Sequence, residues 1–189
     1  MVFVDSTMRE LLKAFASDEA RVRLAASKSL RDLSQRQPAR VYPHFDVLAG
    51  LLTHENNVLK WNAILALANL ASVDREGRID RLLDEYLTPI AGPVMITAAN
   101  IIKGATLIAL VKPHLADRIA HQLMRVEKAK YATPECRDVA IGHTLEALRM
   151  MIVVVSDTRA VRKFAARHID NPRRATALKA RRLLARAAA

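Results

Sequence analysis

Breaks between helices recur at nearly constant spacing along this chain of 189 residues, and few folds are compatible with that regularity. Helix-start signals stand 37, 38, 41 and 38 residues apart, at Asp18, Glu55, Pro93, Pro134 and Pro172. A shorter helical segment precedes each start, over residues 6–16, 41–52, 78–86, 113–125 and 158–168. A single hairpin of this length cannot bury its apolar faces alone, so neighbouring hairpins must stack. The sequence therefore predicts a series of stacked helical hairpins.

The second helices of the first two hairpins carry matching apolar residues. An offset of 37 residues superimposes Ala26 on Ala63, Leu30 on Leu67 and Leu33 on Leu70. Their spacing of three and four places them on one helix face. Asp18 is expected to cap the first of these helices, since its carboxylate can accept from free amides of the first turn. Asn62 and Asn100 coincide at an offset of 38 and are expected to bond to the backbone of a neighbouring hairpin.

Composition points to the same class. The chain holds 32 alanines but only 5 glycines and 4% aromatic residues, which favours helix over sheet sandwiches and glycine-rich nucleotide folds. All 7 prolines lie between expected helices or at their first turns. Proline costs little there, whereas in a helix interior it costs about 3 kcal/mol. An all-α protein is predicted.

Two segments resemble the second helix of HEAT/armadillo repeats. They are Asp18–Arg23 with Ala26, Leu30 and Leu33, and Glu55–Trp61 with Ala63, Leu67 and Leu70. The resemblance implies one domain over residues 1–189, a right-handed α-α superhelix (solenoid) of about five HEAT-like hairpins, roughly 6–36, 38–72, 78–111, 113–150 and 157–189. The chain is also similar to uncharacterised bacterial HEAT-repeat proteins. Members of this class are mostly scaffolds and adaptors, so the resemblance implies binding rather than catalysis.

One further face of the second helices is expected to line the concave side, the usual binding surface of a solenoid. The candidate partner-binding residues on this face are Lys28, Arg31, Trp61, Lys103 and His143. The alternative is that Trp61 packs between adjacent second helices and that the lysines are ordinary solvated residues.

Positive charge is concentrated at the C-terminal end. The whole chain has 30 Lys and Arg against 19 Asp and Glu, a net charge of +11, and residues 157–189 hold 10 basic and 2 acidic residues. The candidate basic patch consists of Arg173, Arg174, Lys179, Arg181, Arg182 and Arg186. Clustered arginine is typical of contacts to nucleic acid or another acidic ligand. The alternative is a basic cap that ends the solenoid.

No catalytic, cofactor-binding or metal-binding pattern is found. The 6 histidines include no i,i+4 pair, and Cys136, the one cysteine, can form neither an intramolecular disulfide nor a Cys-based zinc site. A lone cysteine and the lack of a signal-peptide pattern favour a cytoplasmic protein. The apolar stretch 89–111 contains Asn100 and Lys103 near its middle, so it is interpreted as a buried helix rather than a membrane span.

The sequence thus predicts a non-enzymatic scaffold or adaptor that binds a protein partner through the concave face. The alternative is a nucleic-acid-binding module that uses the Arg-rich last hairpin. A HEAT-like DNA-repair glycosylase is disfavoured, because that activity needs several pocket aromatics and the chain has one Trp. No cofactor and no particular oligomeric state are indicated.

Overall fold

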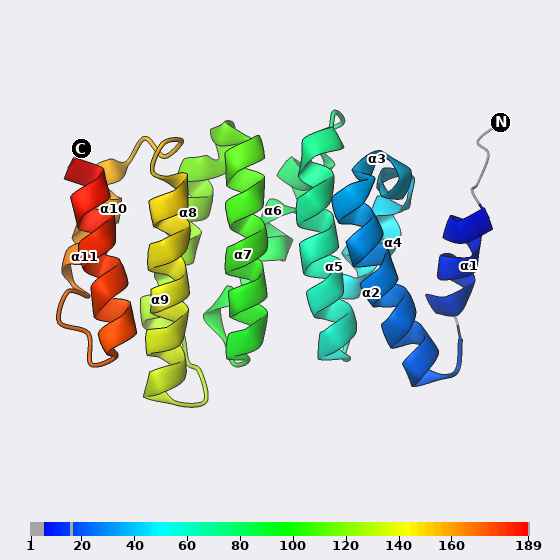
Figure 1. Ribbon diagram of the computed structural model, residues 1–189, viewed down its shortest axis with the longest axis horizontal. Coiled ribbons are helices and arrows are strands. Elements are labelled where there is room, and N and C mark those ends of the chain that lie inside the picture. Colours follow the sequence, from blue (N-terminus) through cyan, green and yellow to red (C-terminus); the bar gives the residue numbers. More distant parts are fainter. Residues whose placement is uncertain (1–5, 16, 189) are drawn as a thin grey trace. The chain divides into compact units, whose positions relative to one another are not determined.

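The computed structural model describes residues 6–15 and 17–188, and every regular element within these ranges is a helix (Figure 1). The all-helical class predicted from the sequence is confirmed. The chain divides into two compact units after Leu82, a position inside helix α6 (Arg78–Leu87).

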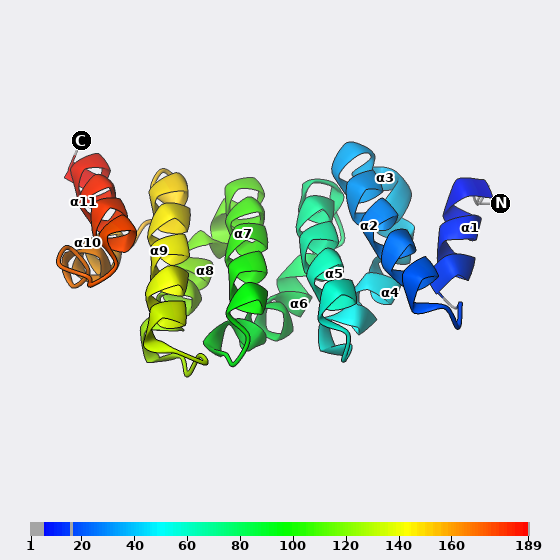
Figure 2. The ribbon, with the colours of Figure 1, turned by 60° about the horizontal axis from the view of Figure 1, so that its bottom comes forward.

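The first unit is built around two long helices, α2 (Ala20–Arg36) and α5 (Asn57–Leu70), which lie side by side in both Figure 1 and Figure 2. Helix α1 (Ser6–Phe15) packs on α2, and α4 (Phe45–Gly50) packs on α5. The unit also contains the short elements α3 (Pro38–Val41), η1 (Tyr42–His44), η2 (Leu51–Thr53) and η3 (Ala71–Val73), and the first part of α6.

The second unit places three long helices in a row, α7 (Met95–Val111), α9 (Pro134–Met151) and α11 (Arg174–Ala188) (Figure 2). Helix α8 (Ala116–Met124) packs against α7 and α9, and α10 (Thr158–Ala166) packs against α11. The short elements η4 (Thr88–Ala91), η5 (Pro113–Leu115) and η6 (Arg125–Lys128) connect them.

The core of the first unit includes apolar residues of α2 and α5. Leu30 and Leu67 are 0% exposed, and Leu33 and Leu70 are also buried. Burying each leucine side chain contributes about 2 kcal/mol. The apolar positions that the offset of 37 superimposes are therefore core positions of this unit.

Two polar pairs cross this same interface. The side-chain amide of Asn62 donates to Ser27 Oγ at 2.8 Å, and the amide of Asn69 donates to Ser34 Oγ at 2.9 Å. The prediction for Asn62 was therefore wrong in its partner, because a side chain and not the backbone of α2 accepts the bond. The prediction for Asn100 was wrong in its target, since its amide donates to Ile96 O within α7.

Helix boundaries follow the prolines closely. Pro38 and Pro134 occupy the first turns of α3 and α9, where the missing N–H is not needed. Gly92 has a φ of 122°, and a Cβ there would lie 2.9 Å from Lys130 O. Only glycine fits this turn, which brings η4 close to the segment after η6.

Two local expectations needed correction. The segment 41–52 is not one helix but a chain of short α and 3₁₀ elements, because Pro43 interrupts its hydrogen bonding. Asp18 does not cap α2: the N-cap position belongs to Glu19, whose side chain makes no capping bond. Ser17 Oγ instead accepts from the Glu19 N–H at 3.2 Å.

The most apolar helix, α7, is buried over most of its length, and its central residues Ile101, Ala105 and Ile108 are 0% exposed. None of the helices within residues 6–15 and 17–188 combines the length and the apolar character needed to cross a membrane.

Candidate binding site

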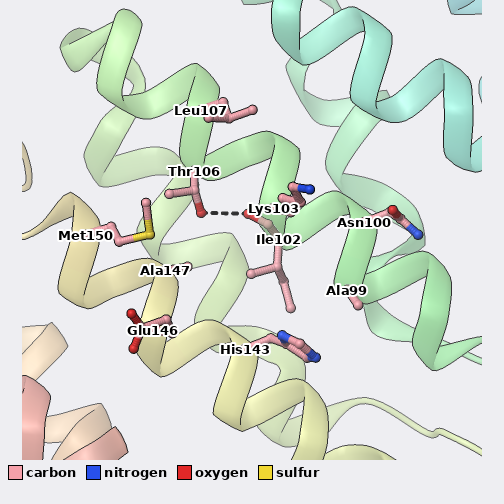
Figure 3. Close-up of a pocket in the computed structure, with 10 residues that line it drawn as sticks. All are labelled: Ala99, Asn100, Ile102, Lys103, Thr106, Leu107, His143, Glu146, Ala147 and Met150. Carbon is pink, nitrogen blue, oxygen red and sulfur yellow. Dashed lines mark hydrogen bonds between the residues drawn. The ribbon is translucent and has the colours of Figure 1, made fainter. Parts of the chain in front are cut away.

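A half-open pocket of about 420 Å³ lies between α7 and α9 in the second unit (Figure 3). It is called the apolar pocket below. Its lining comes from both helices: Ala99, Asn100, Ile102, Lys103, Thr106 and Leu107 from α7, and His143, Glu146, Ala147 and Met150 from α9. A volume of this size falls in the range of ordinary ligand and side-chain pockets.

The floor of the apolar pocket is apolar because two helices meet there through small and branched side chains. Ile102 and Ala147 are 2% and 4% exposed. Thr106 is also buried, and its hydroxyl donates to Ile102 O at 2.7 Å, as Figure 3 shows. The hydroxyl of Thr106 thus has its hydrogen-bond acceptor within α7, and it needs no acceptor on a ligand.

The rim of the apolar pocket is polar. Lys103 is exposed on the α7 side, and His143 and Glu146 stand one turn apart on α9. Burial lowers the pKa of His143, and the nearby charges of Lys179 and Arg173 lower it further. The lowered pKa favours the neutral imidazole, which offers hydrogen bonds rather than charge.

Glu146 is held in place by an arginine on its own helix. Arg149 Nη2 donates to Glu146 Oε1 at 2.6 Å, and Arg149 Nε lies 3.1 and 3.2 Å from the two carboxylate oxygens. These hydrogen bonds hold the pKa of Glu146 below its usual range in spite of partial burial. The positive charges of Lys179 and Arg182 on α11 lower it further.

A second pocket, of about 450 Å³, adjoins the first and is called the arginine pocket below. It lies between α9 and α11 and is lined by Glu146, Arg149, Arg182, Ala185 and Arg186. Glu146 lines both pockets, so the apolar pocket and the arginine pocket meet at this carboxylate.

The residues predicted to line the concave face do not form one site in the structure. Lys103 and His143 come together at the apolar pocket. Lys28 and Arg31 line a different pocket in the first unit, together with Val58 and Asn62. Arg31 Nη1 donates to Asn62 Oδ1 at 2.9 Å, and Arg31 also pairs with Asp32.

Trp61 lies on α5, half-buried, and lines neither the apolar pocket nor the pocket that holds Lys28 and Arg31.

The residues of the predicted basic patch differ in their surroundings, and only some of them line a pocket. Arg173 lies 3.7 Å from Glu135, and Arg181 lies 3.5 Å from Asp170 and donates to Ile169 O. Arg182 and Arg186 face the arginine pocket.

The other two members of the patch differ in exposure. Arg174 is exposed at the start of α11, and Lys179 is half-buried near His143 and Glu146.

Glu146, Arg149 and Met150 were not among the site residues predicted from the sequence. One signal was present, because a glutamate three residues before an arginine on a helix forms an ion pair. The sequence did not show that Glu146 and Arg149 line a pocket together with Arg182 and Arg186 of the next long helix.

Within the described residues, no group of three or more His, Cys, Asp or Glu side chains is placed to hold a metal ion. The candidate site combines an apolar surface, an imidazole and a cluster of guanidinium groups.

No protein-family model and no curated protein sequence matches the chain. Among solved structures, it is similar to an engineered protein whose crystal structure was a target of the Northeast Structural Genomics Consortium. The two chains share 17% sequence identity at a TM-score of 0.62, and the match covers 100% of this chain and 80% of that chain. At this identity the similarity concerns the fold alone.

Proposed function

We propose that the protein is a non-enzymatic scaffold or adaptor that binds a segment of a protein partner through the second unit. The observation that carries the proposal is the apolar pocket between α7 and α9, open on one side and bordered by polar groups. An apolar pocket with a polar rim is the arrangement in which a buried side-chain anchor contributes most of the binding energy of a protein interface.

An exposed apolar side chain in the pocket supports a protein ligand. Met150 on α9, which lines the pocket, is 45% exposed. Ile96, Leu110 and Val111 are further exposed apolar residues of α7, which supplies the other wall of the pocket. Exposed apolar surface at a pocket typically marks an interaction site.

We further propose that the hairpins are HEAT-like repeats that form a right-handed solenoid. The spacing of 37 to 41 residues supports this proposal, as do the long helices that lie side by side within each unit. The single cysteine favours a cytoplasmic location for such a scaffold.

The test uses Met150→Asp, which puts a charge on the exposed wall of the apolar pocket. Val153→Asp is the matched control, since Val153 is 71% exposed and does not line that pocket. Both variants and the unaltered chain serve as bait in extract of the source cells, with quantitative mass spectrometry of the bound proteins. The proposal expects a protein that the unaltered chain and V153D retain and M150D loses. If the same proteins bind all three baits, the apolar pocket is not the binding site.

A second candidate function is binding of nucleic acid through α11. The supporting observation is that α11 carries no carboxylate, and that Arg174, Arg182 and Arg186 form no ion pair within 4.0 Å in the part of the chain that the structure describes, although the charge of Arg182 lowers the pKa of Glu146. Retention on DNA and RNA at low ionic strength tests it. Retention that falls with salt and is lost in Arg182→Gln/Arg186→Gln supports this function, and no retention at low salt excludes it.

A further inference from the structure

We propose that the arginine pocket binds acidic side chains of the protein partner, so that the bound segment carries an apolar anchor with aspartate or glutamate close beside it. The inference rests on the proposed function, and it names the chemistry of the segment that the scaffold recognises. The anchor occupies the apolar pocket, and its acidic neighbours contact the guanidinium groups of Arg182 and Arg186.

The first support is the contact between the two pockets. Glu146 lines both of them, so a single extended or helical segment can reach the apolar floor and the guanidinium groups at once. A ligand without an apolar group would leave the floor around Ile102 and Ala147 empty. This geometry favours a peptide over a nucleic-acid backbone, which offers phosphates but no apolar side chain.

The second support is the balance of charge. Glu146 is the one carboxylate among the residues that line the two pockets, and Arg149 already neutralises it. Lys103, Arg182 and Arg186 remain as lining cations, and Lys179 adds its charge close by. An acidic ligand is therefore attracted, and a basic one is repelled.

The third support is spacing. Arg182 and Arg186 are four residues apart on α11, so their side chains project from the same helix face one turn apart. A guanidinium group binds a carboxylate through two parallel N–H bonds, which gives direction as well as attraction. Two such groups side by side suit a segment with two nearby carboxylates.

A purely structural explanation competes with this one. Arg149 and Arg186 lie in the last turns of α9 and α11, where cations stabilise the negative end of the helix dipole, and Arg182 lies one turn before Arg186. That role predicts a loss of thermal stability on substitution but no preference among ligands. The experiment below therefore measures ligand choice and stability separately.

The experiment selects peptides from a random 16-residue display library against the full chain. The proposal expects enriched peptides with an apolar residue and Asp or Glu within about four positions of it. Their dissociation constants should rise at least about tenfold in Arg182→Gln/Arg186→Gln, as expected when charge-assisted hydrogen bonds are lost. The matched control is Arg159→Gln/Arg174→Gln, which removes the same charge from two exposed arginines outside both pockets.

The outcomes separate this inference from the proposed function. One outcome is that the selected peptides lose affinity in M150D and yet show no preference for acidic residues, and another is that they bind R182Q/R186Q as well as the unaltered chain. Either result overturns the inference and leaves the scaffold function standing. A library that yields no peptide sensitive to M150D overturns the scaffold function itself. Loss of stability in R182Q/R186Q with binding unchanged assigns these arginines to the helix dipole alone and also overturns the inference.

A charge reversal keeps the test decisive if R182Q/R186Q is too unstable to measure. Arg182→Glu/Arg186→Glu should lose the selected acidic peptide and gain affinity for the same peptide with Lys in place of its acidic residues. A general effect on folding would weaken both peptides alike, and that result would overturn the inference.

Discussion

The side-chain amide of Asn62 on α5 donates to the hydroxyl of Ser27 on α2 across 2.8 Å, and both side chains are buried. Ser27 Oγ in turn donates to Leu24 O at 2.8 Å, so its hydroxyl hydrogen is already used and its oxygen is free to accept the amide. The same arrangement recurs two turns later between Asn69 and Ser34, whose hydroxyl donates to Arg31 O.

The Asn62–Ser27 bond should couple α2 to α5 measurably. Ser27→Ala and Asn62→Ala are each expected to lower the free energy of unfolding by about 1 to 3 kcal/mol. Ser27→Ala leaves the buried amide of Asn62 without its acceptor, and Asn62→Ala removes that bond and also the one from Arg31. The double variant should lose less than the sum, with a coupling energy of about 1 kcal/mol. Urea unfolding of the four proteins measures this. The Ser34 and Asn69 cycle is the control and should give a smaller value, since Asn69 is less buried.

Gly142→Ala should destabilise the contact between α9 and α11. A Cβ at Gly142 would lie 2.7 Å from Thr176 Oγ1, which is fixed by its own bond to Asp138 O at 2.9 Å. We expect a loss of about 1 to 2 kcal/mol, even though alanine favours helix by about 1 kcal/mol over glycine. Thermal unfolding followed by circular dichroism checks it.

Gly50→Ala is the control for that substitution, because a Cβ at Gly50 meets no atom within 4 Å. It should leave the protein as stable as before or slightly more stable. Adding Thr176→Ala to Gly142→Ala should recover part of the loss. If G142A proves as stable as G50A, the close approach of α9 and α11 is not present in solution.

Thr144→Val should stabilise the protein. Thr144 is 0% exposed, and its hydroxyl has no hydrogen-bond partner within the described residues. Valine keeps the shape and removes a buried polar group that is not satisfied, so we expect a gain of about 1 kcal/mol. The comparison is Thr106→Val, where the lost hydroxyl does donate to Ile102 O, and that variant should show no gain. Denaturant midpoints distinguish the two.

Stability should fall in acid through Glu127, which links η6 to the end of α10. Burial raises the pKa of Glu127, but hydrogen bonds and charge from Arg167, with His168, outweigh burial and hold it below its ordinary value of 4.5. A lowered pKa in the folded state means that the stabilisation is present above the unfolded pKa. It is lost as the pH falls through the folded pKa.

Glu127→Gln should therefore lower stability at pH 7 by about 1 kcal/mol and flatten the acid limb of the stability curve. Melting temperatures between pH 3 and pH 7 test this. Glu55→Gln, which alters an exposed glutamate before α5, should leave the acid limb unchanged. If the melting temperatures of E127Q and the unaltered chain fall equally between pH 7 and pH 3, Glu127 does not contribute to the loss of stability in acid.

The helical architecture was predictable because its signal is local and repeated. Apolar residues three and four apart mark a helix face, and prolines mark its limits, as at Pro38 and Pro134. The 3₁₀ elements around Pro43 were missed, since the apolar pattern of residues 41–52 continues across that break. The Ser27–Asn62 bond was missed because it depends on how far one helix is shifted along the other.

The candidate site was predictable only in part for the same reason. Lys103 and His143 were predicted to lie on the same face of successive second helices, and the structure brings them together at the apolar pocket. The arginine pocket required Arg149 on α9 to face Arg182 and Arg186 on α11, and those positions do not correspond in the repeat. Clustered arginine in the sequence shows only that positive charge is abundant in the last hairpin. The structure shows that Arg173 and Arg181 pair with carboxylates, so these two arginines are less available to a ligand than the others.

Glu146 lines both pockets, so ligands bound as proposed in the two pockets should be thermodynamically linked through it. A ligand in either pocket that moves this carboxylate changes its distance from Arg149 and so alters the field in the other pocket. By thermodynamic reciprocity, the change that the first ligand makes in the binding free energy of the second equals the change that the second makes in that of the first. Two short peptides, one apolar and one acidic, are thus expected to bind this surface with affinities that depend on each other.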